Sequence, residues 1–209
     1  MELQGRLQKT GKVLQGSNSF MNIRVAHEKK GCAEKILPFL KDGESIYNTL
    51  LVSKPGAGKT TCLRDCIRSL SNGKEGWEGM KICVVDERSE IAACHLGIPQ
   101  NDMGIRTDVL SGCGKSEGMM LMLRSMSPQI IAVDELGGKK DFQAVEQAAC
   151  SGVRILGTVH ADTVEELWEK PYLKKWMKRG IFERFILIRH NRSGERDFQV
   201  FNGKREQLC

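Results

Sequence analysis

One short segment carries the clearest chemistry in the sequence: a glycine-rich stretch that ends in Gly-Lys-Thr and is followed by a second threonine. Its residues are Ser53, Lys54, Pro55, Gly56, Ala57, Gly58, Lys59, Thr60 and Thr61. Glycines here would let successive N–H groups point at one phosphate, and the start of a helix adds partial positive charge. In such a loop Lys59 is expected to reach the β- and γ-phosphates of a nucleoside triphosphate. The Thr60 hydroxyl is expected to ligate Mg²⁺ and Thr61 to contact the α-phosphate.

The loop departs from the usual pattern Gly-x-x-x-x-Gly-Lys-Ser/Thr at its first position, where Ser53 replaces glycine. A small residue is expected to suffice there, at most with weaker nucleotide affinity. The alternative is a glycine-rich turn with a chance Gly-Lys-Thr. The apolar run before the loop and the helical spacing after it argue against that alternative.

Two adjacent carboxylates, Asp134 and Glu135, follow the apolar run Ile130–Val133. Asp134 is expected to hold Mg²⁺ through water, and Glu135 to act as the general base that polarises the attacking water. Hydrolysis in such sites depends mainly on positioning and charge stabilisation. An acidic pair after a strand can also be no more than a helix N-cap, but the phosphate-binding loop favours the catalytic interpretation.

Two further polar groups stand at strand ends: Asp86-Glu87-Arg88 and Thr158-Val159-His160. An open parallel sheet binds its ligand at the carboxyl ends of its strands. Glu87 and His160 are therefore candidates to sense the γ-phosphate or to orient water. A purely structural hydrogen-bonding role for His160 stays open.

The elements that must position these residues alternate between apolar strands and amphipathic helices. We expect helices over 33–40, 59–70, 117–126, 141–150 and 163–177, and strands over 46–52, 81–86, 129–134, 154–159, 185–188 and 198–201. This alternation predicts right-handed crossovers and an α/β fold, with a mainly parallel sheet covered by helices on both faces.

The length of 209 residues, 40% of them hydrophobic, allows one sizeable core. Residues 1–30 are expected to form a short N-terminal β appendage or the remnant of a longer N-terminal domain, since Met21, Ile23 and Val25 alternate with polar residues. Residues 31–209 are expected to form the P-loop ATPase domain.

The charge, the cysteines and the hydropathy of the sequence limit which partners, metal sites and cellular locations are expected. The net charge of +6 hints only at some anionic partner. The 8 cysteines contain no Cys-x-x-Cys pair and lie mostly in apolar stretches, which predicts reduced thiols in the cytosol and no thiol metal site. No apolar run approaches the roughly 18 residues of a membrane span, and the amino terminus lacks a signal-peptide core. We therefore expect a cytoplasmic protein without a membrane span of its own.

The combined motifs resemble the stage III sporulation protein AA family of spore-forming Gram-positive bacteria. The resemblance runs from about residue 22 to 185. It rests on the stretches 22–26, 31–33, 85–91, 106–110, 117–120, 124–128 and 133–135, together with the glycine-rich loop. That family is itself similar to the ATPases of type II and type IV secretion, which are RecA-like ring hexamers. The likeness thus implies a RecA-like P-loop ATPase that binds ATP and Mg²⁺ and assembles with copies of itself into a ring, expected to be a hexamer.

The same resemblance implies a motor for a secretion-like channel between mother cell and forespore. It would act from the mother-cell cytoplasm, held at the membrane by membrane-embedded sporulation channel proteins. By analogy with secretion ATPases, Asp86-Glu87 matches their acidic box and Thr158-Val159-His160, more loosely, their histidine box. The resemblance implies that family members are longer at the amino end, so the chain is expected to be either a fragment or a natural short form. The arginine acting across a subunit interface would then be Arg88, Arg106 or Arg124, unless each only pairs with a nearby carboxylate.

Two other functions remain open at this point. The shared core and the positive charge also suit a nucleic-acid-dependent RecA-type ATPase, although a nucleic-acid partner is not expected. The third possibility is a nucleotide-gated scaffold that does not hydrolyse ATP, against which the presence of Glu135 argues. A small-molecule kinase fits less well, because no acceptor-binding lid is evident. GTP is disfavoured by the family likeness and by the lack of an Asn-Lys-x-Asp signature.

Overall fold

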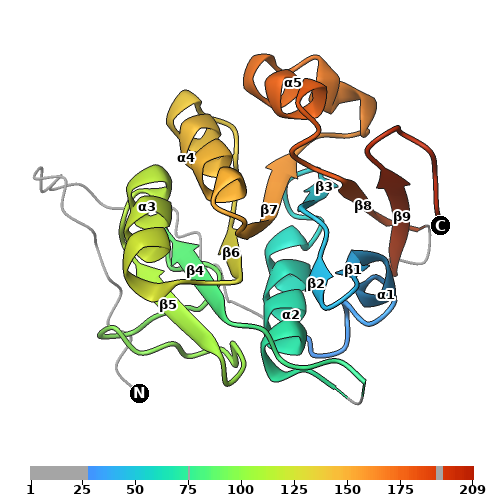
Figure 1. Cartoon of the computed structure of the whole chain (residues 1–209). Coiled ribbons are helices and arrows are strands. Elements are labelled where there is room, and N and C mark those ends of the chain that lie inside the picture. The colour runs from blue at the N-terminus through green and yellow to red at the C-terminus, as the bar shows by residue number, and fades with distance from the viewer. Residues whose placement is uncertain (1–27, 75, 192–194) are drawn as a thin grey trace, which may run out of the picture.

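A seven-stranded sheet runs through the middle of the computed structural model, which describes residues 28–74, 76–191 and 195–209 (Figure 1). Its strands lie in the order β5-β4-β6-β7-β3-β8-β9. They are β3 Thr49–Ser53, β4 Ile82–Asp86, β5 Thr107–Ser111, β6 Ile130–Val133, β7 Arg154–His160, β8 Arg184–His190 and β9 Arg196–Asn202. Neighbouring strands from β5 to β8 pair in parallel, and β9 pairs with β8 antiparallel. The expected mainly parallel sheet is confirmed, whereas the expected N-terminal β appendage lies almost wholly outside the described residues.

Helices cover both faces of this sheet, as the alternation predicted. On one face lie α1 Leu37–Leu40 and α2 Lys59–Asn72; on the other lie α3 Lys115–Met126, α4 Lys139–Cys150 and α5 Pro171–Lys178 (Figure 1). The strand β3 is buried along its whole length because its side chains alternate between the two cores. Leu50 and Val52 pack with α3, α4 and α5, and Leu51 packs with α1 and α2. Burial on both faces explains why the central strands read as continuous apolar runs.

Two helices are shorter than expected from the sequence, and a proline explains each difference. The helix expected over 33–40 is reduced to α1, because Pro38 has no N–H to bond the carbonyl of Glu34 in a longer helix. The helix expected over 163–177 is divided into a 3-10 turn, η1 Glu165–Trp168, and α5, which begins at Pro171. Lys170, directly before that proline, is extended, as the steric clash with a following proline ring requires.

Two strand expectations also need correction. The strand expected over 46–52 begins only at Thr49, because Ser45–Ile46 forms β2, which pairs with β1 Lys41–Asp42 in a separate hairpin. The edge strand β5 was not predicted, since each of its residues is only partly buried and its sequence lacks an apolar run.

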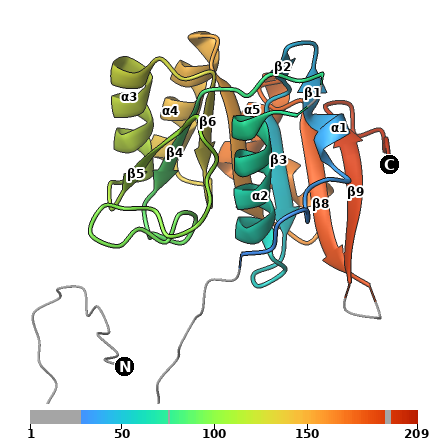
Figure 2. The same ribbon diagram turned by 90° about the horizontal axis from the view of Figure 1, so that it is seen from below.

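The loop between β3 and α2 lies at the same edge of the sheet as the end of β8 and the start of β9 (Figure 2). This arrangement follows from the register, because β8 runs parallel to β3 and ends at His190, opposite Arg196, the first residue of β9. The end of the sheet that carries the glycine-rich loop is therefore flanked by the β8–β9 hairpin.

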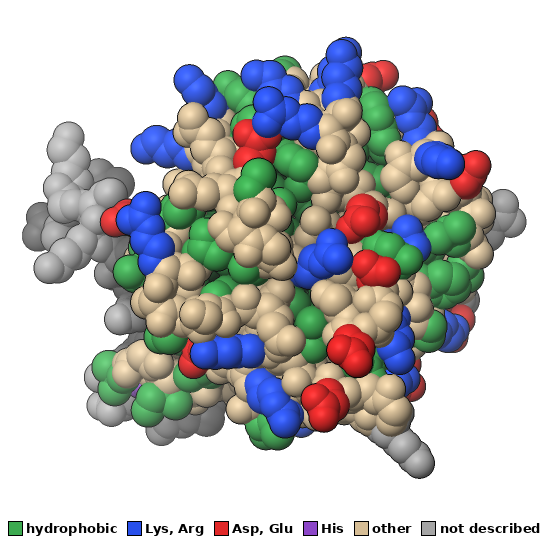
Figure 3. All heavy atoms as spheres, in the orientation of Figure 1, with side chains coloured by type: hydrophobic (Ala, Val, Ile, Leu, Met, Phe, Trp, Pro, Cys, Tyr) green, Lys and Arg blue, Asp and Glu red, His purple; other side chains and the backbone are tan. Residues whose placement is uncertain are grey.

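Lysine and arginine side chains gather over α4 and α5, along the upper margin of the face in Figure 3. The basic residues of α5 and its C-terminal end are exposed: Lys174, Lys175, Lys178 and Arg179. Lower on this face, acidic and basic side chains are mixed. None of the helices in the described ranges is long and apolar enough to cross a membrane.

Candidate active site at the carboxyl edge of the sheet

The expected site residues lie at one edge of the sheet. β3, β4, β6 and β7 are parallel, and one of the polar groups singled out in the sequence stands at the carboxyl end of each, either in its last residues or directly after them. Ser53 stands beside His160 in the register of β3 and β7. The fold thus brings together the glycine-rich loop, Glu87, the Asp134-Glu135 pair and His160, at the edge where open parallel sheets bind ligands.

The backbone of the loop accounts for both its glycines and its unusual first residue. Gly56 and Gly58 have φ angles of 78° and 87°, a region that residues with a Cβ rarely adopt. Ser53 instead belongs to the strand β3 and needs no glycine conformation. Its hydroxyl donates a hydrogen bond to the Lys54 carbonyl at 2.9 Å. Serine therefore fits the first position of this loop without backbone strain.

Lys59 is buried beneath the loop. Its ammonium donates to the carbonyl oxygens of Ser53 and Lys54, both at 3.1 Å, and to Nδ1 of His160 at 2.9 Å. Burial lowers the pKa of Lys59, opposed by the charges of Asp134 and Glu135. Because an ammonium can only donate, Nδ1 of His160 must accept, which leaves the ring hydrogen of a neutral His160 on Nε2.

Thr60 and Asp134 join the loop to the acidic pair. The Thr60 hydroxyl donates to Asp134 Oδ2 at 2.8 Å. Asp134 Oδ1 accepts hydrogen bonds from the buried Thr158 hydroxyl and from the Glu135 N–H. In turn, Thr158 Oγ1 accepts from the same N–H at 2.9 Å. Thr158 therefore fixes the Asp134 carboxylate and the backbone of Glu135 together.

These oxygens fit Mg²⁺ bound with a nucleotide. Mg²⁺ is usually held by one or two protein oxygens together with substrate phosphates and waters. A hydroxyl and a carboxylate 2.8 Å apart supply such a pair, at Thr60 and Asp134. No group of three or more His, Cys, Asp or Glu side chains suited to a metal occurs among the residues that the structure describes. An all-protein metal cage is not what a site of this type requires.

Glu135 is held by hydrogen bonds and charges from several directions. His160 Nε2 lies 3.0 Å from its Oε1, and Arg88 Nη1 lies 2.9 Å from its Oε2. Lys115, at the start of α3, donates to the Glu135 carbonyl at 2.9 Å. The hydrogen bond from His160, followed by the charge of Arg88, lowers the pKa of Glu135 and keeps it ionised. Its φ of 53° is an uncommon backbone conformation that these contacts stabilise.

The two acids of the Asp86-Glu87 pair have different roles. Asp86 is buried and accepts the backbone N–H groups of residues 90–92 at 2.8–3.1 Å, so it builds the turn after β4. Glu87 is partly exposed and pairs with Lys115 at 3.3 Å. Because Lys115 also contacts Glu135, Glu87 borders the site, whereas Asp86 is structural.

Of the three arginines considered for an interface, Arg88 alone lies beside the acidic pair. Arg106 precedes β5, and Arg124 lies in the last turn of α3, so both stand toward the amino edge of the sheet. Arg88 pairs with Glu135 of its own chain, the surface pairing left open from the sequence.

Several residues at the site were not assigned from the sequence. Lys115, Lys170 and Arg196 contact Glu135, His160 and Gly58, respectively. No motif marks them, because their contacts depend on how the chain between each residue and its partner folds. Lys115 could have been found had β5 been predicted, since the residues after β5 must reach the same edge.

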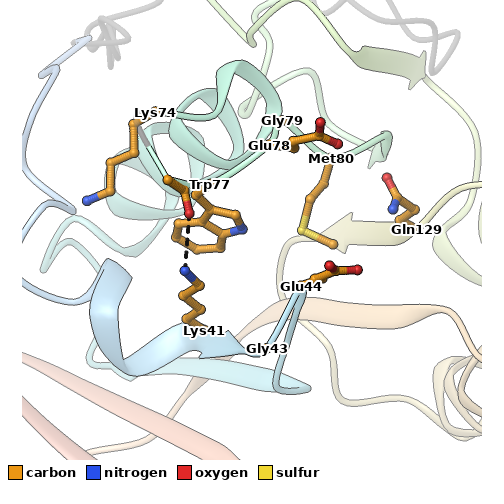
Figure 4. Close-up of a pocket in the computed structure, with 10 residues that line it drawn as sticks. Lys41, Gly43, Glu44, Lys74, Trp77, Glu78, Gly79, Met80 and Gln129 are labelled. Atoms are coloured by element: carbon orange, nitrogen blue, oxygen red, sulfur yellow. Dashed lines mark hydrogen bonds between the residues drawn. The ribbon is translucent and has the colours of Figure 1, made fainter.

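A cavity of about 640 Å³ opens beside the loop. Its lining includes Lys54, Gly56, Asp162, Leu187 and His190. A second cavity, of about 570 Å³, lies at the opposite edge, where Lys41 stands 5.4 Å from the centre of the Trp77 ring and donates to the Gly76 carbonyl (Figure 4). The first cavity adjoins the glycine-rich loop. A separate, smaller hollow is lined by residues that include Glu87, Lys115, Asp134 and Glu135, so we take both as parts of the site.

Comparisons with known proteins agree with this fold. The X-ray structure of the Legionella pneumophila ATPase DotB superposes with a TM-score of 0.62 at 16% identity, over 84% of this chain and 51% of that one. The VirB11 ATPase of the Brucella suis type IV secretion system gives 0.54 at 14% identity, over 83% and 54%. At such identities the likeness shows the fold alone, that of the P-loop secretion ATPases.

Sequence comparison is more specific. The stage III sporulation protein AA of Bacillus subtilis (strain 168) is 44% identical over 165 residues, which are 79% of this chain and 53% of that protein. The chain thus spans about half the length of this relative. The family model described as sporulation stage III, protein AA, matches residues 9–208. Because this match covers nearly the whole chain, the protein belongs to the sporulation stage III, protein AA family.

Proposed function

We propose that the chain binds Mg–ATP at the glycine-rich loop and hydrolyses it. The observation that carries the proposal is the contact of 2.8 Å between Thr60 and Asp134, with Glu135 fixed next to it. The contact supports the proposal, because it brings the glycine-rich loop next to Asp134 and the ionised Glu135. The similar solved structures are of ATPases, which supports the same conclusion.

Each residue then has a defined task. The N–H groups of the loop and the Lys59 ammonium bind the β- and γ-phosphates, while Thr60 and Asp134 hold Mg²⁺. Bound Mg²⁺ supplies charge neutralisation on the phosphates. Glu135 accepts a proton from water as the water oxygen attacks the γ-phosphorus. The bond from that phosphorus to the bridging oxygen breaks, giving ADP and inorganic phosphate.

His160 positions both the phosphate-binding lysine and the general base. Its two ring nitrogens connect Lys59, which contacts phosphate, with Glu135, which contacts water. Glu87 acts one contact further out, through Lys115. His160 is thus suited to report the presence of the γ-phosphate to the base, and Glu87 to adjust the position of Glu135.

Family membership supports a proposal about the larger role of the protein. We propose that the protein works as a ring-shaped oligomer, a hexamer as in the secretion ATPases it resembles. It would act from the mother-cell cytoplasm on membrane-embedded channel proteins between mother cell and forespore. ATP is proposed over GTP on the family likeness. Because the chain spans only about half of its Bacillus subtilis relative, the remaining part of such a protein is expected to contribute to assembly.

The test is ATP hydrolysis by the purified chain over a wide range of protein concentrations, with its mass in solution measured alongside. Turnover should rise with assembly and disappear in Lys59→Ala, while Lys81→Ala, a change at an exposed lysine before β4, keeps it. Glu135→Gln should retain bound ATP and lose roughly 10²–10⁴-fold in turnover. Unchanged turnover in Glu135→Gln would remove Glu135 as the base.

Two further outcomes distinguish the alternatives. Tight ATP binding without turnover at any concentration would favour the nucleotide-gated scaffold. Salt-sensitive stimulation by DNA would favour the nucleic-acid-dependent ATPase, and the exposed lysines of α5 would be the first residues to change. We expect neither outcome.

A further inference from the structure

The guanidinium of Arg196 lies against the glycine-rich loop. Arg196 is the first residue of β9, and Gly58 directly precedes α2. A Cβ atom added to Gly58 would stand 2.6 Å from Nη2 of Arg196 and 2.9 Å from both Cζ and Nε. The contact is possible only because residue 58 has no side chain.

This guanidinium has no partner of its own in the described part of the chain. Its Nη1 is enclosed and makes no hydrogen bond, and no carboxylate there forms an ion pair with it. A buried polar group without a hydrogen bond costs free energy, so the arrangement needs a compensating partner.

The surroundings of Arg196 make that partner an anion. The N-terminus of α2 carries partial positive charge, which repels a cation placed there. The buried Lys59 ammonium stands in the same loop. Positive charge thus meets at Gly58 from a helix end and two side chains, whereas the acids of the site, Asp134 and Glu135, contact Thr60, His160 and Arg88.

The sheet order shows from which side each group meets the glycine-rich loop. β7 and β8 flank β3 on opposite sides, and β9 lies beyond β8. His160 and the acidic pair therefore meet the loop from the β7 side, where the γ-phosphate must react. Arg196 meets it from the β8–β9 side, next to the first turn of α2, where its charge also reaches the Cys62 thiol.

We infer that Arg196 binds the α-phosphate of the nucleotide, from within the same subunit. The inference rests on the proposed nucleotide site and adds to it a residue outside its motif. Arg196 contributes to ground-state affinity and leaves the chemical step alone, because it stands away from Glu135 and the attacking water.

The test compares the binding of ATP, ADP, AMP and adenosine, by competition with a fluorescent ATP analogue. Arg196→Ala should weaken ATP, ADP and AMP by a similar factor of about 10–100, the range for one charge-assisted hydrogen bond, and leave adenosine unchanged. Arg196→Lys should recover part of the loss. Arg205→Ala, an equal change of charge beyond the far end of β9, should bind like the unchanged protein.

A general defect of folding would weaken adenosine too, and the melting temperatures of the variants without nucleotide would reveal it. Equal affinities for all ligands in Arg196→Ala and the unchanged protein would overturn the inference while leaving the proposed function intact. A loss confined to ATP would also overturn it, because the contact would then be to the γ-phosphate. If the unchanged chain binds no nucleotide, the proposed function itself fails.

Discussion

The protonation state of Glu135 is set by the side chains that contact it. The carboxylate accepts from His160 and Arg88, and the carbonyl of the same residue accepts from Lys115. A base of this kind is ready at neutral pH, because its proton is already lost. The same contacts weaken it as a proton acceptor, so its efficiency depends on their rearrangement when a nucleotide binds.

The lowered pKa of Glu135 makes stability depend on pH. A carboxyl group whose pKa is lower in the folded than in the unfolded state, here from an ordinary value of 4.5, stabilises the fold above that value. This stabilisation is lost as pH falls through the lower, folded-state pKa. We expect Glu135→Gln to lower the free energy of unfolding at neutral pH, by an amount that shrinks below about pH 4.

Urea unfolding at a series of pH values measures this difference. Glu169→Gln, at an exposed position, removes the same charge and serves as the control. A deficit in Glu135→Gln that stays constant from neutral to acid pH would contradict the assigned ion pairs.

Thr158 is expected to matter through its hydroxyl alone. Thr158→Val keeps the shape but leaves the Glu135 N–H and Asp134 Oδ1 each without this buried partner, and we expect a loss of about 1–3 kcal/mol in unfolding free energy. Thr158→Ser should recover most of it. Urea unfolding of the three proteins is the measurement, and equal losses in the valine and serine variants would point to packing instead.

At the scale of elements, the β8–β9 hairpin and the glycine-rich loop restrict each other. Gly56 and Gly58 share a left-handed backbone, but an added Cβ meets nothing within 4 Å at Gly56 and meets Arg196 at Gly58. Both alanine variants should be destabilised by about 1–2 kcal/mol of backbone strain. Gly58→Ala should be destabilised somewhat more, because the Arg196 side chain must move aside and give up its contact. Thermal unfolding should show this order.

Arg196→Ala should relieve the extra cost of Gly58→Ala while leaving Gly56→Ala unchanged. A double-mutant cycle measures that coupling directly. Additive effects of Gly58→Ala and Arg196→Ala would mean that the two groups do not restrict each other.

Local patterns predicted most elements and failed where a single residue overrode them. The apolar runs around β4, β6 and β7 predict strands directly, because strands buried on both faces must be apolar. In the helix expected over 163–177 the apolar spacing continued through Pro171, yet a missing N–H divides the backbone there. The strand β5 was not predicted, because an edge strand needs few apolar residues.

The site residues likewise fall into those that local patterns predict and those that only the folded structure reveals. Lys59, Thr60 and Asp134 belong to motifs whose spacing reflects one turn or one strand end, so the sequence predicts them. Thr158 stood in a noted motif without a role, and Arg196 in none. Their tasks arise from contacts between elements that only the assembled sheet defines.

For the whole molecule, a bound nucleotide should stabilise the fold by mass action. At a ligand concentration of 100 times Kd the gain is about 2.7 kcal/mol, which for a chain of this size raises Tm by roughly 5–10 °C. We expect Mg–ADP to produce this shift, and Lys59→Ala to abolish it. Differential scanning fluorimetry over a range of ADP concentrations measures it; a shift that persists in Lys59→Ala would place the nucleotide elsewhere.

The sheet order also has a consequence for the newly made chain. Of the seven strands of the sheet β3 leaves the ribosome first, but its neighbours are β7, which begins at Arg154, and β8, which begins at Arg184. Until those residues emerge, an apolar strand has both hydrogen-bonding edges open, and contacts so distant along the chain form slowly. The loop that follows β3 is therefore made before the strands that flank it, and it gains its fixed shape only after β8 has emerged.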